Sequence, residues 1–192
     1  MKPYSIHKYS IKKFPFYALL SKCLGYEYLG ELHNQFTTDH DSATAYKQKF
    51  NQDLERGWEN FEEKYTLFIK EVVEPLVSEE LVYPKWPTLE IHPPKGNGTP
   101  EFKRNQEEGT NFTIPLTPSY ETNAVWAESE PNKGDFQPLE GGVGDLFLFN
   151  GDKCLHGNKT NLTDSTRVSL DFQTSLCGKR EGEGREEELF NG

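Results

Sequence analysis

Prolines and glycines divide the second half of the chain into short segments. After Leu81 they recur every few residues, at Pro84, Pro87, Pro93, Pro94, Gly96, Gly98, Pro100, Pro115 and Pro118. Because proline has no backbone N–H and clashes with the preceding turn, this part of the chain cannot form long helices. The sequence therefore predicts short strands here and a mainly β fold.

Five segments between these turns are rich in residues that favour strands. They span 88–92, 111–116, 123–128, 145–149 and 166–174. The last of them alternates apolar and polar residues, which is the pattern of a strand with one buried face. Short strands at this spacing, preceded by helices, predict a sandwich or barrel that is buttressed on one side.

An amphipathic helix is predicted before the strands. Large apolar residues recur at steps of three and four, at Tyr46, Phe50, Leu54, Trp58, Phe61, Tyr65, Phe68 and Val72. This period places them on one face of a helix. Because Pro75 cannot continue a helix interior, we expect one long helix that ends near Glu74 and packs on the side of a sheet.

At 192 residues the chain suits one structural domain. We expect three parts within it: an N-terminal segment with the long helix (1–80), the β core (81–177), and a charged, glycine-bearing tail (178–192) that is acidic and flexible. The formal net charge of −10 argues against a nucleic-acid partner, which needs clustered basic residues.

Neither a membrane span nor a secretory signal is recognisable in the sequence. No apolar run approaches the roughly 20 residues that cross a bilayer. We therefore expect a cytoplasmic protein without a membrane partner, and we do not expect glycans at the four Asn-x-Ser/Thr sites, Asn97, Asn111, Asn158 and Asn161. The three cysteines lack CxxC spacing, which argues against a disulfide framework or a thiolate zinc site.

A histidine and an arginine stand close together in the second half. The strand at 145–149 leads into a turn at Asn150-Gly151, then to His156, and eleven residues later to Arg167 (167 − 156 = 11). If the flanking strands form an antiparallel pair, both side chains face one interior. Imidazole can bind a metal or carry a proton, and guanidinium can clamp a carboxylate. Spacing alone leaves surface or structural roles open for both residues.

The stretch from about Thr88 to Leu176 resembles the iron(II)- and 2-oxoglutarate-dependent oxygenases, in their streptomycin-biosynthesis-type, phytanoyl-CoA-hydroxylase-like branch. The matching blocks are Asn111-Phe112, Pro115-Leu116-Thr117, Thr122 to Pro131, Lys133 to Phe136, Phe149-Asn150-Gly151, Cys154 to Asn158 and Thr166 to Ser169. The resemblance implies a double-stranded β-helix, a jelly-roll barrel of the cupin type. It also implies iron(II) and 2-oxoglutarate as cofactors and hydroxylation of a small molecule.

The same resemblance assigns roles to residues. His156 matches the distal histidine of the iron site. Arg167 matches the arginine that binds the far carboxylate of 2-oxoglutarate. Ser169 lies two residues further along the same strand face, and Asn111 is the third residue assigned to the co-substrate.

The chain departs from the family at the other metal ligands. Where the family has a His-x-Asp segment, this chain reads Glu101-Phe102-Lys103-Arg104-Asn105. Lys103 replaces the histidine, and its ammonium group has no lone pair for a metal. Asn105 replaces the carboxylate. Asn105 and Glu107 are therefore only weak candidates as metal ligands.

Three accounts remain open from the sequence. In the first, which we favour, the protein is an oxygenase with an atypical metal site built from His156 and one of Glu101, Glu107, Glu108 or His92. In the second, iron is absent and Lys103 and Arg167 bind 2-oxoglutarate or another small anion. In the third, the barrel is a structural or interaction module in which Arg167 pairs with Asp145 or Asp171.

Overall fold

The computed structural model describes residues 4–36, 39–77, 80–95 and 101–177, without the side chains of 39–42. The helical elements are α1 (Phe16–Leu24), η1 (Leu29–Gln35), α2 (Asp39–Glu55), η2 (Trp58–Asn60), α3 (Phe61–Phe68), the π-helical η3 (Ile69–Val73), α4 (Glu74–Val77) and η4 (Glu121–Asn123). The strands are β1 (Tyr4–Lys8), β2 (Leu81–Val82), β3 (Thr88–His92), β4 (Phe102–Lys103), β5 (Thr110–Pro115), β6 (Val125–Ala127), β7 (Gln137–Pro138), β8 (Asp145–Phe149), β9 (His156–Asn158) and β10 (Arg167–Leu176).

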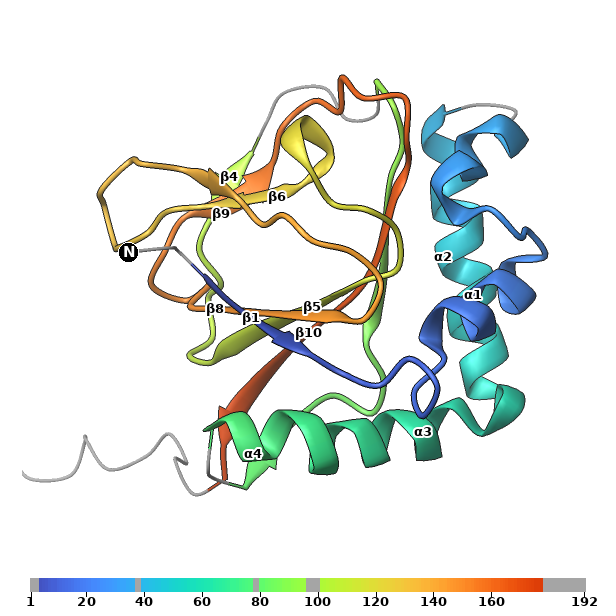
Figure 1. The fold of residues 1–192 in the computed structure, drawn as a ribbon, viewed down its shortest axis with the longest axis horizontal. Coiled ribbons are helices and arrows are strands. Elements are labelled where there is room, and N and C mark those ends of the chain that lie inside the picture. Colours follow the sequence, from blue (N-terminus) through green and yellow to red (C-terminus); the bar gives the residue numbers. More distant parts are fainter. Residues whose placement is uncertain (1–3, 37–38, 78–79, 96–100, 178–192) are drawn as a thin grey trace, which may run out of the picture.

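Two antiparallel sheets form the β core. The larger sheet has the order β1-β8-β5-β10-β2, and β3 also pairs with β10. The smaller sheet has the order β4-β9-β6-β7. Figure 1 shows the smaller sheet above the larger one, with α2 and the α3–α4 rod beside the larger sheet. The predicted mainly β, jelly-roll-like fold is confirmed.

The two faces of the larger sheet differ in chemistry. On β10, Val168, Leu170 and Phe172 are buried in the core that the sheet shares with the helices. The Phe172 ring packs edge-on against Tyr65 of α3, with 5.5 Å between centroids. Because side chains alternate along a strand, Arg167, Ser169 and Asp171 point to the opposite face, toward the smaller sheet. The helices thus provide the main apolar core, and the space between the sheets receives polar side chains.

The predicted long helix is interrupted. Gly57 (φ 73°), Glu59 (φ 50°) and Asn60 (φ 53°) adopt left-handed backbone conformations, which end one helical segment and re-aim the next. The apolar stripe packs on the core as expected, with Tyr46, Trp58 and Val72 only half-buried, but it is divided between helices that meet at an angle (Figure 1). The predicted end near Glu74 is also wrong. Pro75 follows directly on the π-helical turn of η3, and the helix continues through it to Val77.

Strand positions agree closely with the sequence pattern. The segments 88–92 and 145–149 are β3 and β8, while β5, β6 and β10 begin or end one to two residues away from the predicted bounds. The short strands β1, β2, β4, β7 and β9 were not predicted. The tail at 178–192 and the sequon at Asn97 lie outside the described residues.

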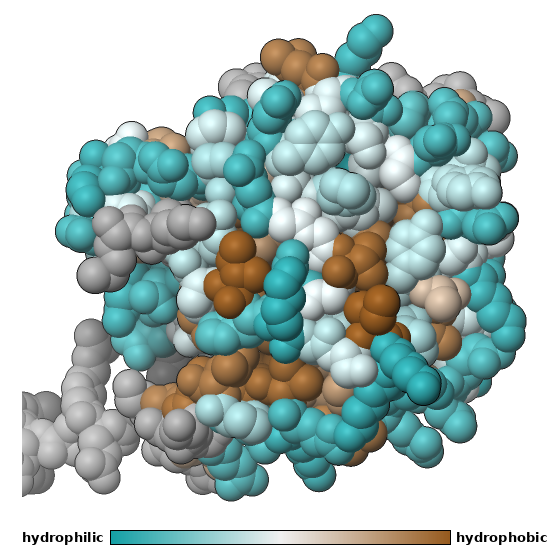
Figure 2. Space-filling view, viewed as in Figure 1, coloured by the Kyte–Doolittle hydropathy of each residue, from teal (hydrophilic) through white to brown (hydrophobic). Residues whose placement is uncertain are grey.

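The visible surface is mostly hydrophilic, with apolar residues gathered near α4 at the lower edge of the sheet (Figure 2). Among the described helices, none is both long and apolar enough to cross a bilayer.

Candidate functional site

His156 and Arg167 lie on strands of different sheets. The hairpin expected from the sequence does not form, because β8 pairs with β1 and β5, while β9 pairs with β4 and β6. The two residues still face one interior. Asn158 lies two residues after His156, on the same face of β9, and its Oδ1 accepts a hydrogen bond from Arg167 Nη2 at 2.8 Å. His156 and Arg167, which were expected on neighbouring strands of one sheet, therefore approach the same interior from opposite sheets.

Arg167 is one of the most thoroughly bonded side chains in the barrel. It is 2% exposed. Its Nε donates to the carbonyl of Asn123 at 2.8 Å and its Nη1 donates to Ser169 Oγ at 3.0 Å, in addition to the bond with Asn158. A guanidinium has five N–H donors, so these three bonds leave two for another partner. Burial lowers the pKa of Arg167, and the nearby carboxylates of Asp171 and Glu90 oppose that effect.

Local contacts fix the start of β10 and hence the position of Arg167. The Thr166 N–H donates to the carbonyl of Gly30 in η1 at 2.7 Å, and Thr166 Oγ1 lies 2.8 Å from His33 Nδ1. On the other side, Thr117 Oγ1 accepts the Val168 N–H at 2.9 Å and donates to the Thr166 carbonyl at 3.1 Å. The helical layer thus contributes directly to the geometry of the arginine.

His156 presents a neutral imidazole to the same interior. Its ring packs edge-on against Phe149, with 5.2 Å between centroids. Nδ1 lies 3.2 Å from the carbonyl of Cys154, and a carbonyl only accepts, so Nδ1 carries the proton and Nε2 keeps a lone pair. Burial lowers the pKa of His156, the bond to Cys154 raises it, and the charge of Lys103 lowers it further. The imidazole is therefore neutral at pH 7.

Glu128 holds the segment that leads into His156. This carboxylate is 1% exposed, and it accepts the Leu155 N–H at 2.8 Å and the Gly134 N–H at 3.0 Å. Its own N–H donates to the Leu155 carbonyl at 3.0 Å. Burial raises the pKa of Glu128, but backbone bonds from Leu155, Gly134 and Asn132 outweigh it and lower the pKa overall. Glu128 is thus a positioning residue for the histidine strand.

Lys103 stands opposite His156 in the register of β4 and β9, so both side chains lie on one face of the smaller sheet. The Lys103 side chain is exposed. The pairing depends on Gly157, where a Cβ would come within 2.1 Å of the Glu101 carbonyl oxygen. Without that close approach β4 could not lie against β9. The lysine therefore occupies the cross-strand neighbour position of the histidine, at the solvent edge.

Asn105 and Asn111 meet at the far end of the interior. Asn105 Nδ2 donates to Asn111 Oδ1 and to Gln173 Oε1, each at 3.0 Å. Gln173 Nε2 in turn donates to the backbone carbonyl of Glu107 at 2.8 Å, while the Glu107 side chain is exposed. The structure brings Asn105 and Asn111 together and leaves the Glu107 carboxylate outside the cluster.

These residues do not fit the iron site of the family. Among the described residues, no three His, Cys, Asp or Glu side chains lie close enough together to hold a metal ion. His156 offers one imidazole, Lys103 offers an ammonium, and the amide of Asn105 is bonded to two neighbouring amides. Ferrous oxygenase centres need two imidazoles and a carboxylate. The described residues therefore do not supply the ligand set of such a centre.

The remaining residues weighed for a rebuilt metal site lie elsewhere. Glu101 and Glu108 are exposed. His92 is opposite Arg167 in the register of β3 and β10, and its Nε2 donates to the carbonyl of Lys159 at 2.9 Å. Burial, together with the charge of Arg167, lowers the pKa of His92 to about 4. His92 is therefore a neutral neighbour of the arginine.

Asp171 adds a carboxylate to the polar face of β10. It lies four residues after Arg167 on that face, and its Oδ1 is buried without a hydrogen-bond partner in the described part of the chain. Burial raises the pKa of Asp171 to about 6, although Arg167 and hydrogen bonds from Ser169 and Thr113 lower it. Asp145, the other suggested partner of Arg167, instead pairs with Lys8 and accepts the Gly142 N–H.

Sequence reasoning missed several residues of this interior. Asn158, Asn123 and Glu128 fall in the blocks that resemble the oxygenases but were not predicted as site residues, and Gln173 was not predicted either. One signal was present: polar residues at every second position of β10, at Arg167, Ser169, Asp171 and Gln173. Three of the sequons fall inside the fold, since Asn111 and Asn158 face the interior and Asn161 is fully buried.

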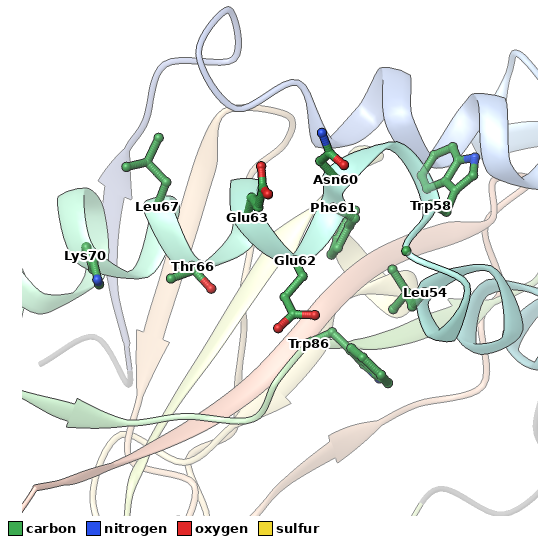
Figure 3. A pocket seen from close by; sticks show the side chains of 11 residues that line it. Leu54, Trp58, Asn60, Phe61, Glu62, Glu63, Thr66, Leu67, Lys70 and Trp86 are labelled. Carbon is green, nitrogen blue, oxygen red and sulfur yellow. The ribbon is translucent and has the colours of Figure 1, made fainter.

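A cavity of about 600 Å³ lies on the helical side of the molecule, away from these residues (Figure 3). Its lining includes Trp58, Phe61, Glu62, Thr66, Lys70 and Trp86. In Figure 3, Trp58 lies at the Asn60 end of α3, and Trp86 lies below the helix, beneath Glu62. The ammonium of Lys85 already covers the Trp86 ring, at 4.8 Å from its centroid.

No protein-family model matches the chain. The chain is 26% identical to the streptomycin biosynthesis protein StrG of Streptomyces griseus over 185 residues, which are 91% of this chain and 85% of StrG. Among solved structures, the nickel complex of the non-heme monooxygenase ThoJ aligns with a TM-score of 0.50 at 8% identity, over 91% of this chain and 74% of that one. EvdMO1 aligns with a TM-score of 0.47 at 18% identity, and the chain spans only 32% of its length.

The likeness to ThoJ shows a shared fold across most of this chain. The relationship to StrG covers the helical layer as well as the barrel, since it extends over nine-tenths of the sequence.

Proposed function

Given that this chain is an oxygenase-like protein related to the iron(II)- and 2-oxoglutarate-dependent family, we propose that it binds 2-oxoglutarate between its sheets and acts on a small molecule, with a metal site unlike that of the family. One observation carries the proposal. Arg167 is buried on the polar face of β10 beside Ser169, and it faces the interior that also receives His156.

The arginine provides what a dicarboxylate needs. Its two remaining N–H donors and the Ser169 hydroxyl lie on one strand face and can bind the two oxygens of one carboxylate. A bond from a charged donor is worth about 1.5–3 kcal/mol, and screening by solvent is weak in a buried site. Asn111, at the other end of the interior, is the proposed polar contact for the second half of the ligand.

The metal end is the part that departs from the family. In a ferrous oxygenase, iron supplies oxygen activation, which the protein side chains cannot provide. Here His156 offers a single lone pair, and Lys103 places a positive charge across the strand from it. Among our three accounts, we favour an oxygenase with an altered metal site, because the relationship to a biosynthesis protein favours an enzyme over a purely structural barrel.

Calorimetric titration with 2-oxoglutarate, in the presence of a chelator, tests the proposal. We expect binding by the wild type, and about tenfold weaker binding by Ser169→Ala, since the variant loses one hydrogen bond to a charged group. Thr174→Val is the matched control. Thr174 lies on the same strand but on the opposite face, and its buried hydroxyl has no hydrogen-bond partner among the described residues.

Two outcomes would contradict the proposal: no heat of binding for the wild type, or equal losses of affinity in S169A and T174V. A parallel assay for succinate release, after loading with iron(II), measures whether the altered metal end still supports turnover of 2-oxoglutarate.

A further inference from the structure

Ser169 connects Arg167 with Asp171 on the polar face of β10. Its hydroxyl oxygen accepts a hydrogen bond from Arg167 Nη1 at 3.0 Å, and its proton is directed to the carboxylate of Asp171. A serine hydroxyl has only one proton to donate. It can serve Asp171 or the carboxylate of a ligand, but not both at once.

Two carboxylates act on the charge of Arg167 inside the barrel, those of Asp171 and Glu90. Asp171 is its carboxylate neighbour on β10, and Thr113 of β5 also hydrogen-bonds to that carboxylate. Glu90 of β3 lies opposite Ser169 and is paired with Lys47 of α2 at 2.7 Å. His92 of β3, the other titratable group beside the arginine, is neutral. An entering anion therefore meets a guanidinium that already interacts electrostatically with Asp171.

Two carboxylates cannot both stay ionised beside one buried guanidinium without a large electrostatic cost. When like charges share a site of low dielectric, one of them binds a proton. Asp171 is the group placed to do so, because its Oδ1 is buried and has no hydrogen-bond donor among the described residues. Protonation would remove its charge and leave the guanidinium to the ligand.

We propose that Asp171 is an exchangeable counter-charge: an entering carboxylate takes over Arg167 and the Ser169 hydroxyl, and Asp171 binds one proton from solvent. The exchange makes and breaks no covalent bond in the ligand. The proton cancels one of the two negative charges that 2-oxoglutarate brings, so the interior becomes more negative only by the ligand's second carboxylate. This inference rests on the proposed 2-oxoglutarate site.

The exchange predicts how affinity depends on pH. Asp171 has a pKa of about 6 before binding, so above pH 6 it must be protonated for the anion to bind. The affinity should then fall about tenfold for each pH unit above 6. His92 and His156 have lowered pKa values and are already neutral there, so they add no proton uptake.

The test is calorimetric titration of the full chain with 2-oxoglutarate and a chelator, in two buffers that differ in ionisation enthalpy. At pH 7.5 the wild type should take up close to one proton per ligand. Asp171→Asn should take up none, and at pH 8 it should bind up to about a hundredfold more tightly than the wild type. Glu90→Gln is the matched control. The Glu90 carboxylate is held by Lys47, so E90Q should keep the proton uptake.

Two results would overturn the exchange but leave the proposed function standing. One is binding of 2-oxoglutarate by the wild type without proton uptake, and the other is an affinity of D171N that depends on pH as that of the wild type does. If neither protein binds 2-oxoglutarate between pH 5.5 and 8, both the exchange and the proposed function are overturned. If D171N does not fold, the number of protons that the wild type takes up per bound ligand still tests the exchange.

Discussion

The two ends of the barrel interior are built in different ways. At the Arg167 end, the side chain is 2% exposed and bonds to Asn123, Ser169 and Asn158, which come from three separate segments of the chain. At the His156 end, the imidazole is held by one backbone carbonyl and one ring contact, and its cross-strand neighbour Lys103 is exposed.

This difference shows which end of the interior tolerates substitution more readily. A buried charge that loses its partners is costly, so the arginine, serine and amide positions depend on one another. A substitution at an exposed position on a short strand changes the free energy of unfolding only slightly. The Arg167 end is thus constrained by its mutual contacts, and the Lys103 position is not.

The largest effect is expected from Arg167→Met. The variant loses three buried hydrogen bonds and the positive charge that lowers the pKa of the half-buried Asp171, so the free energy of unfolding should fall by about 3–5 kcal/mol. Urea denaturation measures the change. Arg104→Met is the control, since Arg104 is exposed and its side chain bonds to Lys153 and Asn132 at the surface. A loss in R167M no larger than in R104M would remove the contrast between the two ends.

Glu128→Gln should have the next largest effect, about 1–3 kcal/mol, because an amide cannot satisfy both backbone N–H groups that the carboxylate now accepts. The effect depends on pH. The pKa of Glu128 is lowered in the folded state, so its contribution is present above the unfolded value of about 4.3 and disappears as pH falls through the lower folded value.

Denaturation curves at pH 7 and at successively lower pH values test this expectation for Glu128. The difference in stability between the wild type and E128Q should shrink as the solution becomes acidic. A difference that stays constant over that range would show that the carboxylate charge does not hold the histidine strand.

Asn105→Ala should cost about 1 kcal/mol, because it removes the two hydrogen bonds to Asn111 and Gln173 at a half-buried position. The exposed neighbour Gln106 gives the control Gln106→Ala, for which thermal unfolding should be unchanged. If both variants unfold alike, the amide cluster does not stabilise this end of the barrel.

The smallest effect on stability is expected from Lys103→Ala, within about 0.5 kcal/mol, as for other exposed positions. Its electrostatic effect is more specific. Lys103 helps to keep the pKa of His156 low, so K103A should raise that pKa. An NMR titration of the imidazole measures the shift, and an unchanged or lower pKa would place the lysine charge away from the histidine.

Much of the larger sheet was predictable because it follows local rules. Alternating residues identified β10, the apolar run at 145–149 located β8, and the prolines on either side delimited β3. The break between α2 and α3 was not predictable from the apolar period. It depends on left-handed backbone conformations at Glu59 and Asn60, and non-glycine residues adopt these only where the surrounding structure requires them.

The candidate site was predicted in its residues but not in its arrangement. His156 and Arg167 lie on different sheets, since strand pairing in a jelly roll joins segments distant in sequence and a single hairpin does not reveal it. The role of Asp171 depends on burial and on the charge of Arg167, which become visible only when β10 is seen with β3 and β5 on either side.

The most direct test of the contrast between the two ends is iron(II) binding, measured by metal analysis of anaerobically loaded protein. The wild type is compared with Lys103→His/Asn105→Asp, which restores the His-x-Asp segment opposite His156. Our account predicts far less than one equivalent of iron in the wild type and a clear gain in the double variant. Iron close to one equivalent in the wild type, with no gain in K103H/N105D, would contradict it.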